Sequence, residues 1–156
     1  MIRGIASCLG WKLIEVKGAT GYLDTNYAGK GEAAIAALDE VDFVAVHVEA
    51  PDEAGHSGDA AAKIKALEQI DEHIVGPLLE KLQTCDAWRV LCLPDHPTPV
   101  SVRTHTSQPV PFAMAGTGVV ADRATGFTEA AGAESDLHID PGHELMEYFL
   151  KVGRET

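Results

Sequence analysis

The sequence predicts an α/β fold in which a mostly parallel sheet is flanked by helices. Runs with strand composition alternate along the chain with runs rich in helix formers, which is the pattern of βαβ units. A length of 156 residues and a hydrophobic content of 46% are enough for one globular domain over residues 1–156. We therefore expect a single sheet whose strands end at a common edge.

The predicted elements follow in order along the chain. Residues 11–16 form a short strand, and residues 30–38, rich in Ala and Glu, form a helix that leads to an apolar strand at residues 42–48. A long helix covers residues 59–82, which Gly76-Pro77 should kink or divide. Residues 87–93 and 111–115 are further strands, and residues 141–150 close as a helix. Apolar residues at steps of three and four mark the buried face of the long helix: Ile64, Leu67, Ile70, Ile74, Leu78 and Leu82.

Charge and cysteine content exclude several classes of binding partner and metal site. The chain has 24 acidic and 12 basic residues, and its net charge of −12 disfavours binding to nucleic acid or to an anionic membrane. The three cysteines, Cys8, Cys85 and Cys92, have no C-x-x-C spacing, so neither a disulfide framework nor a cysteine zinc site is expected. No apolar stretch approaches the ~20 residues of a membrane span, and the amino terminus lacks a signal peptide. These features predict a soluble cytoplasmic protein.

Five metal-binding side chains follow two of the predicted strands. Asp52 and His56 lie just after the strand at residues 42–48, Asp95 and His96 follow the strand at residues 87–93, and His105 comes nine residues later. Because the carboxyl ends of parallel strands meet at one edge of a sheet, we expect these side chains to converge. Carboxylate and imidazole ligands without thiolate suit Mn²⁺, Zn²⁺ or Co²⁺. Two such ions about 4 Å apart could clamp a phosphoryl group and supply the positive charge that the chain lacks.

The other histidines have more ordinary expected roles. His47 lies inside a predicted buried strand and is expected to be a hydrogen-bonded core or near-site residue. His73 is expected on a solvated helix face, whereas His138 and His143 are expected to be surface or capping residues.

Three further polar residues could serve a site. Ser57 lies beside His56, but Ser57-Gly58-Asp59 is also typical of a helix start, so a capping role is favoured over a nucleophile. Lys30 and Arg103 could contact a phosphate, although such residues are often solvated surface cations.

Several motifs together resemble a known family. They include Gly18-Ala19-Thr20-Gly21-Tyr22, Asp24-Thr25-Asn26-Tyr27, Asp42-Phe43, His47-Val48-Glu49, Asp52-Glu53-Ala54-Gly55-His56, Pro94-Asp95-His96-Pro97-Thr98-Pro99, Pro109-Val110-Pro111-Phe112 and Gly142-His143-Glu144-Leu145-Met146. With Lys30 and His105, they make nearly the whole chain similar to the carboxyl-terminal part of archaeal-type 2,3-bisphosphoglycerate-independent phosphoglycerate mutases. These are metalloenzymes of the alkaline phosphatase superfamily.

The resemblance implies a partial alkaline-phosphatase-like α/β/α sandwich and two divalent ions, of Mn²⁺, Zn²⁺, Co²⁺ or Mg²⁺, without 2,3-bisphosphoglycerate. It assigns Asp52, His56 and His105 to one ion, and Asp95 and His96 to half of the second ion's shell. The nucleophilic Ser, a further Asp and an inserted substrate domain would come from an amino-terminal portion not found in these residues. No catalytic residue is assigned in this chain, because none of its serines matches the sequence context of the nucleophile. The serines considered are Ser7, Ser57, Ser101, Ser107 and Ser135.

The implied function is part of a glycolytic isomerase. The complete enzyme would interconvert 3-phosphoglycerate and 2-phosphoglycerate through a phosphoserine, and this chain alone is expected to be inactive. The alternatives are another metal-dependent phosphoryl-transfer enzyme, such as a proposed homoserine kinase or a phosphatase, and a noncatalytic metal-binding chain that pairs with a separate partner. The missing amino-terminal portion would leave a sheet edge exposed, so a homo-oligomer is also considered.

Overall fold

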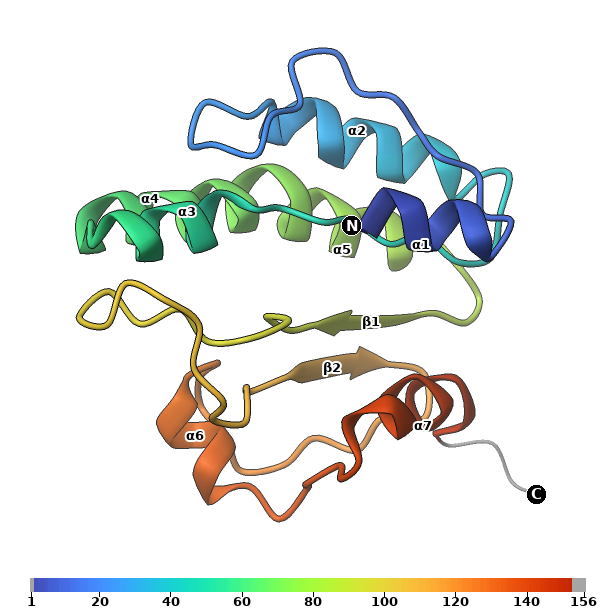
Figure 1. Ribbon diagram of the computed structural model, residues 1–156. Helices are drawn as coiled ribbons and strands as arrows, with labels where there is room; N and C mark the ends of the chain where they lie inside the picture. The colour runs from blue at the N-terminus through green and yellow to red at the C-terminus, as the bar shows by residue number, and fades with distance from the viewer. Residues whose placement is uncertain (1, 153–156) are drawn as a thin grey trace. The chain divides into compact units, whose positions relative to one another are not determined.

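The computed structural model describes residues 2–152, which fall into two compact units, Met1–Leu78 and Leu79–Thr156. The first unit contains α1 (Ile2–Cys8), α2 (Tyr27–Ala37), α3 (Ala50–Ser57), α4 (Ala60–Ile70) and the π-helix η1 (Asp71–Val75) (Figure 1). Helix α5 (Gly76–Leu82) crosses the boundary. The second unit contains β1 (Arg89–Cys92), β2 (Ala113–Gly116), α6 (Glu129–Glu134), the 3-10 helix η2 (Gly142–Glu144) and α7 (Leu145–Lys151).

Helix α2 confirms the helix predicted at residues 30–38 but begins earlier. The Asn26 side chain accepts a hydrogen bond from the Gly29 amide and donates one to the Lys17 carbonyl, so it caps the helix and anchors the preceding loop. In that loop the buried Thr25 hydroxyl accepts a bond from the Thr20 amide. The motif at residues 18–22 therefore forms the ordered loop that precedes α2.

The long helix predicted at residues 59–82 is present and divided. The Asp59 side chain caps α4 by accepting from the Ala62 amide, while Ser57, the favoured capping residue, instead ends α3. The division lies at η1, just before Gly76-Pro77, where the Gly76 amide bonds the carbonyl of Asp71 five residues back. Pro77 has no N–H to offer the His73 carbonyl, which explains why regular α-helical bonding is lost at this point.

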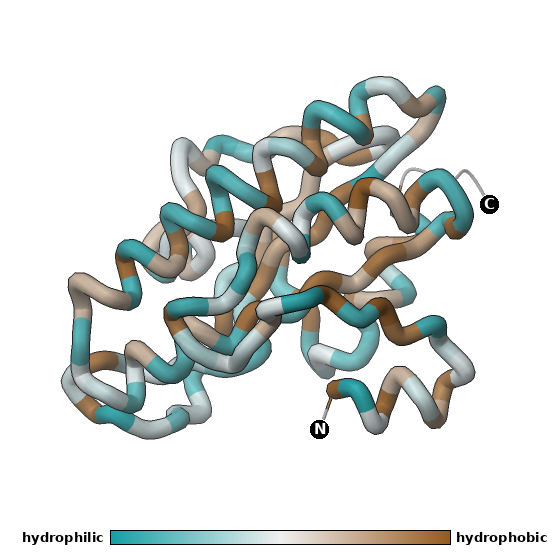
Figure 2. The backbone as a smooth tube through the Cα atoms, turned by 90° about the horizontal axis from the view of Figure 1, so that it is seen from above, coloured by the Kyte–Doolittle hydropathy of each residue, from teal (hydrophilic) through white to brown (hydrophobic). Residues whose placement is uncertain are grey.

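The core of the first unit is built of Tyr27, Ala50, Ala66 and Ile74, against which Val46, Val48, Ile70 and Leu78 pack. The prediction that Ile64 and Leu67 are buried is wrong, because these residues are 58% and 53% exposed. The wider turn at η1 changes the phase of the helix. The residues that face the core are therefore spaced four apart: Ala66, Ile70, Ile74 and Leu78. The predicted spacing of three and four residues does not hold before Ile70. Figure 2 shows hydrophobic and hydrophilic residues alternating along the helical parts of the chain.

The strands differ from the predicted sheet. Strands β1 and β2 confirm the strands predicted at residues 87–93 and 111–115, but they pair antiparallel, with Arg89 opposite Gly116 and Cys92 opposite Ala113. Mixed helices and strands agree with the α/β class, whereas the expected mostly parallel sheet is not formed within residues 2–152. Residues 11–16 and 42–48 have strand composition but belong to no ladder, because a strand exists only where a neighbour supplies the hydrogen bonds.

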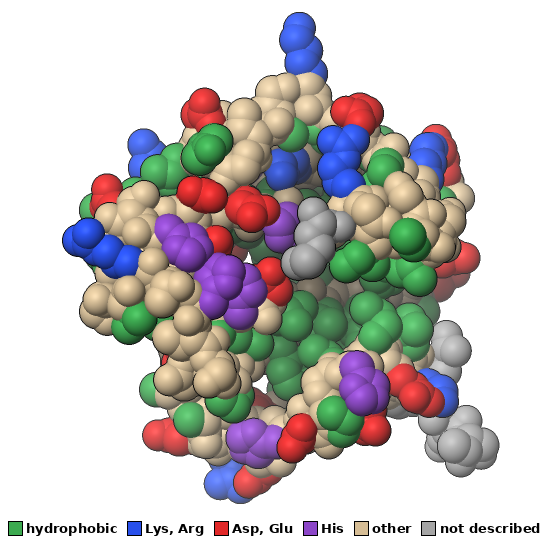
Figure 3. All heavy atoms as spheres, in the orientation of Figure 1, with side chains coloured by type: hydrophobic (Ala, Val, Ile, Leu, Met, Phe, Trp, Pro, Cys, Tyr) green, Lys and Arg blue, Asp and Glu red, His purple; other side chains and the backbone are tan. Residues whose placement is uncertain are grey.

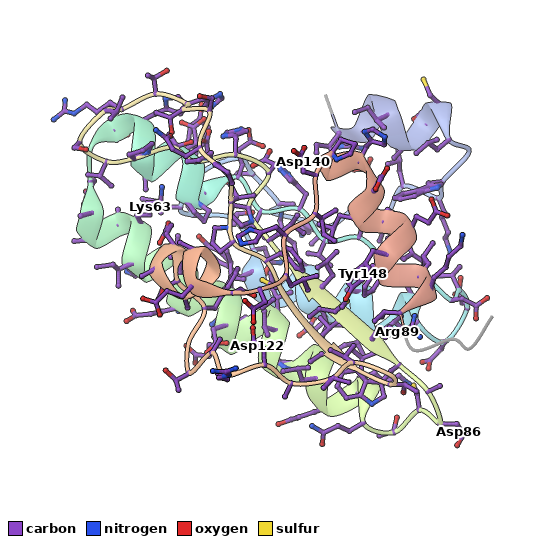
Figure 4. All side chains as sticks on the ribbon, turned by 90° about the horizontal axis from the view of Figure 1, so that it is seen from below. Lys63, Asp86, Arg89, Asp122, Asp140 and Tyr148 are labelled. Atoms are coloured by element: carbon purple, nitrogen blue, oxygen red, sulfur yellow. The ribbon has the colours of Figure 1, made fainter. Side chains whose placement is uncertain are left out.

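Arg89 joins β1 to the terminal helix of the second unit. Its Nη1 donates to the carbonyls of Phe149 and Leu150 at 2.9 Å each, and its Nε donates to the Thr117 carbonyl at 2.8 Å. Figure 4 shows Arg89 near the helix that carries Tyr148. Helices η2 and α7 confirm the helix predicted at residues 141–150. The one charged residue in an otherwise apolar strand thus satisfies carbonyls at the end of α7.

We expect Arg89→Met to lower the free energy of unfolding by about 2 kcal/mol, because the carbonyls of α7 lose a charged donor while the apolar stem is kept. Urea denaturation followed by circular dichroism measures the change. Arg123→Met, at an exposed position, is the matched control and should shift stability by less than about 0.5 kcal/mol. Equal losses in the two variants would contradict the role given to Arg89.

The described surface agrees with the charge of the sequence. On the face that Figure 3 shows, Lys and Arg side chains are scattered among acidic ones and form no continuous basic patch. None of the helices in residues 2–152 is long and apolar enough to cross a membrane. No disulfide joins Cys8, Cys85 or Cys92 in the part of the chain that the structure describes.

Candidate metal centre

Helix α3 presents Asp52 and His56 on one face. Pro51 lies in its first turn, where its missing N–H costs nothing, and Gly58 ends it in the left-handed conformation at φ 73°. The helix is therefore short and well defined, and one turn separates the two side chains. Asp52 Oδ2 and His56 Nε2 lie 3.3 Å apart. This confirms that the spacing of four residues directs the two groups to the same place.

The Asp52–His56 pair has the geometry that a shared ion requires. With metal–ligand bonds of about 2.1 Å, two ligand atoms of one tetrahedral or octahedral ion lie about 3.0–3.4 Å apart. The observed 3.3 Å falls in this interval. The side chains are 23% and 36% exposed, so solvent ions can reach them without unfolding of the helix. The donor set and its spacing fit a divalent ion.

The second unit places Asp95 and His96 in the loop that follows β1. Asp95 Oδ1 accepts from the His96 amide at 3.1 Å, and Asp95 Oδ2 lies 3.5 Å from His96 Nε2. The Thr98 hydroxyl lies 3.3 Å from His96 Nδ1. With Nδ1 on the Thr98 hydroxyl, the Nε2 atom of the imidazole faces the Asp95 carboxylate.

Thr98 has no predicted role in the site. It is only 4% exposed, and its hydroxyl contacts the ring of His96. A hydroxyl residue between two prolines, two positions after a candidate ligand, is the sequence signal that could have identified it, because such a group often fixes the orientation of the ligand.

His105 lies beside His96 within the same unit. The ring centroids are 3.7 Å apart and the ring planes meet at 36°. A backbone bond of 3.1 Å from the Thr106 amide to the Pro97 carbonyl holds the two parts of this loop together. The structure thus brings His105 to His96, whereas the resemblance assigns them to different ions. The distribution of the five ligands between two ions stays a prediction.

Lys30 lies against the segment that leads into α3. Its Nζ donates to the His47 carbonyl at 2.8 Å. Burial lowers the pKa of Lys30, and the nearby Glu49 carboxylate opposes this effect. The His47 side chain is 40% exposed, with Nδ1 3.7 Å from Glu49, so the predicted core position is wrong, while the alternative of a near-site residue stays a prediction. Among residues 2–152 this segment pairs with no other strand.

Arg103 has an unusual backbone conformation. Its φ is 59°, in the left-handed region that residues other than glycine rarely adopt. Its amide donates a hydrogen bond of 2.8 Å to the Pro99 carbonyl. It ends a tight turn two residues before His105. The role of Arg103 as a phosphate contact stays a prediction. His138 and His143 are exposed, as expected.

The shifted pKa of Lys30 has a consequence for stability. In the window between the lowered pKa and the ordinary value of 10.5, the unfolded chain binds more protons than the folded chain, so stability due to this group rises with pH. As the pH rises from 7 towards 10.5, we expect the unfolding free energy of the wild type to increase relative to that of Lys30→Arg. The arginine of the variant stays charged throughout this range, so it makes no such contribution. Urea titrations across this range test it. A constant difference between the two proteins would contradict the assignment.

Comparisons with known proteins agree with this chemistry. Residues 1–151 match the Metalloenzyme superfamily. The chain is 50% identical over 151 residues to a 2,3-bisphosphoglycerate-independent phosphoglycerate mutase of Methanothrix thermoacetophila, covering 96% of this chain and 38% of that protein. It is 45% identical to a probable enzyme of the same name from Geobacter sulfurreducens, again covering 96% and 38%. The PH0037 protein of Pyrococcus horikoshii has a similar structure, with a TM-score of 0.89 at 29% identity over 97% of this chain and 46% of that one. The chain thus spans about two fifths of the length of these curated relatives.

Proposed function

We propose, because the chain belongs to the Metalloenzyme superfamily, that it is the metal-binding portion of a cofactor-independent phosphoglycerate mutase. The observation that carries the proposal is the Asp52–His56 pair, whose ligand atoms are spaced for one ion. The pair lies in a chain that is 50% identical to a mutase over 96% of this chain's own length. The proposed reaction interconverts 3-phosphoglycerate and 2-phosphoglycerate in the cytoplasm, and residues 1–156 alone are inactive.

In this proposal the ligands are Asp52, His56, Asp95, His96 and His105. Bound divalent ions supply the positive charge that stabilises phosphoryl oxygens, which a chain of net charge −12 does not provide by itself. In this proposal the nucleophilic serine and the substrate domain come from the portion of the enzyme that this chain does not span. The ions are Mn²⁺, Zn²⁺, Co²⁺ or Mg²⁺, and 2,3-bisphosphoglycerate is not used.

The chain's own residues have three further proposed roles. Thr98 holds the imidazole of His96 through Nδ1, which fixes the ring orientation and the ligand nitrogen. Arg103 and Lys30 are the proposed phosphate contacts. The Lys30 ammonium has three N–H donors and bonds the His47 carbonyl with one, so two are left for a substrate oxygen.

The decisive experiment restores the rest of the enzyme. Residues 1–156 are joined in one polypeptide to the portion of the Methanothrix relative that they do not match, and conversion of 3-phosphoglycerate is measured after metal removal and reloading with Mn²⁺ or Zn²⁺. We expect activity that depends on the metal and falls at least about 100-fold in His96→Ala. His138→Ala, at an exposed position, is the control and should keep full activity. Absence of activity with every divalent ion, in a folded protein, would overturn the proposal.

A further inference from the structure

A cavity of about 280 Å³ lies within the first unit. It is lined by residues of the loop that precedes α2, by the first residue of α2 and by one side of α4. None of the five candidate metal ligands lines it. Its volume is just below the range of about 300–1,000 Å³ that is usual for drug-sized ligands, so the cavity suits a smaller metabolite.

The buried members of the lining form a mostly apolar floor. Tyr27 and Ala66 are 6% and 1% exposed and belong to the core of the unit. The Tyr27 hydroxyl is itself buried out of reach of solvent, so the ring and not the hydroxyl faces the cavity. Leu23, which is more exposed, adds apolar surface beside the floor. The cavity therefore offers an aromatic ring and aliphatic groups to the body of a ligand.

The rim of the cavity carries one charge of each sign. Asp24 and Lys65 are its exposed charged residues. Asp24 Oδ1 accepts from the Thr20 hydroxyl at 2.8 Å, and no residue within 2–152 donates to Oδ2. The Lys65 ammonium forms no hydrogen bond or ion pair with the described residues, so the two charges do not neutralise each other. A carboxylate and an ammonium that flank one cavity without pairing are complementary to a ligand that carries both charges.

We propose that this cavity binds a free α-amino acid with an apolar side chain. The ammonium of the ligand pairs with Asp24, its carboxylate pairs with Lys65, and its side chain lies on the floor of Tyr27 and Ala66. A simple anion is repelled by Asp24, a simple cation is repelled by Lys65, and a neutral polyol gains little from an apolar floor. The site does not depend on the mutase reaction, because it contains neither a metal ligand nor a reacting group.

The floor supplies most of the expected affinity. Ion pairs at an exposed rim contribute little by themselves, so they orient the ligand, whereas burial of its apolar side chain holds it in place. We therefore expect L-leucine to bind with a dissociation constant of about 1 mM or lower, and glycine to bind at least about 10-fold more weakly.

The test is a chemical-shift titration of residues 1–156 by NMR, after removal of metal ions with a chelator. The ligands are L-leucine, isoamylamine, which lacks the carboxylate, and isocaproate, which lacks the ammonium. We expect shifts at the amides of Thr25 and Ala66, and an affinity at least about 10-fold lower for each analogue than for L-leucine.

Matched variants test the two charges of the rim. Asp24→Asn keeps an oxygen for the Thr20 hydroxyl, and Lys65→Met keeps the apolar stem. Each should weaken L-leucine binding at least about 10-fold. The controls are Asp42→Asn and Lys17→Met, which make the same changes at exposed positions outside the cavity. They should leave the affinity unchanged within about twofold.

Four results would overturn the proposal. The first is the absence of L-leucine binding to the folded chain. The second is equal binding of L-leucine and of either analogue, since the missing charge would then not be recognised. The third is unchanged affinity in both Asp24→Asn and Lys65→Met. The fourth is loss of binding in the full-length polypeptide described above, which would show that the rest of the enzyme fills the cavity.

Discussion

Replacing Asp52 by Asn and His56 by Ala together is expected to weaken Mn²⁺ or Zn²⁺ binding to this chain by at least about 100-fold. Their ligand atoms lie 3.3 Å apart on one turn of α3, so both can bind one ion without a change of backbone. The change removes one charged and one neutral ligand, which leaves the local site without its carboxylate. Calorimetric titration measures the affinities of wild type and variant.

The chain offers a closely matched control for this experiment. Glu72 and His73 also form an acid–histidine pair, but their Oε2 and Nε2 atoms lie 3.9 Å apart, farther than the 3.3 Å of Asp52–His56 and the 3.5 Å of Asp95–His96. Glu72→Gln with His73→Ala makes the same change in charge as the first double substitution. We expect it to leave metal affinity unchanged within about twofold. Equal affinity of wild type and the Asp52→Asn, His56→Ala variant would remove α3 from the metal site.

Local features of this chain are predictable from the sequence. The run of helix formers at residues 30–38 predicts α2 except for its first turn, and the direction of the Asp52–His56 pair follows from a spacing of four. The interruption near residue 76 follows from the missing N–H of Pro77. Each of these depends on bonds between residues a few positions apart, which the sequence itself contains.

Features that depend on distant partners could not be predicted in the same way. The composition of residues 42–48 predicts a buried strand, but burial and a ladder both need neighbouring strands, and the described residues contain none for this segment. The antiparallel pairing of β1 with β2 joins segments about twenty residues apart and is set by the path of the loop between them. The proximity of His105 to His96 depends on the same loop, so spacing along the chain could not assign it.

Gly31→Ala is expected to lower the free energy of unfolding by about 2–3 kcal/mol, which is the usual cost of forcing a methyl group into a filled space. A Cβ at this position would lie 2.1 Å from the carbonyl oxygen of His73 and 3.3 Å from the Cα of Ile74. Both atoms belong to the backbone of η1, so no side-chain rotation can relieve the contact. Helix α2 must then move away from η1, which opens the core between Tyr27 and Ile74.

The predicted loss follows from how proline and glycine act together at this contact. Pro77 leaves the His73 carbonyl without its helical donor, and that carbonyl points at the backbone of α2, where only a glycine allows so close an approach. Gly4→Ala in α1 is the matched control, since nothing lies within 4 Å of its added Cβ, and it should stabilise the protein by about 0.5–1 kcal/mol. Urea denaturation of the two variants measures both effects. An unchanged midpoint for Gly31→Ala would mean that α2 slides along η1 at no cost, and the tight backbone contact would then not be what holds the first unit together.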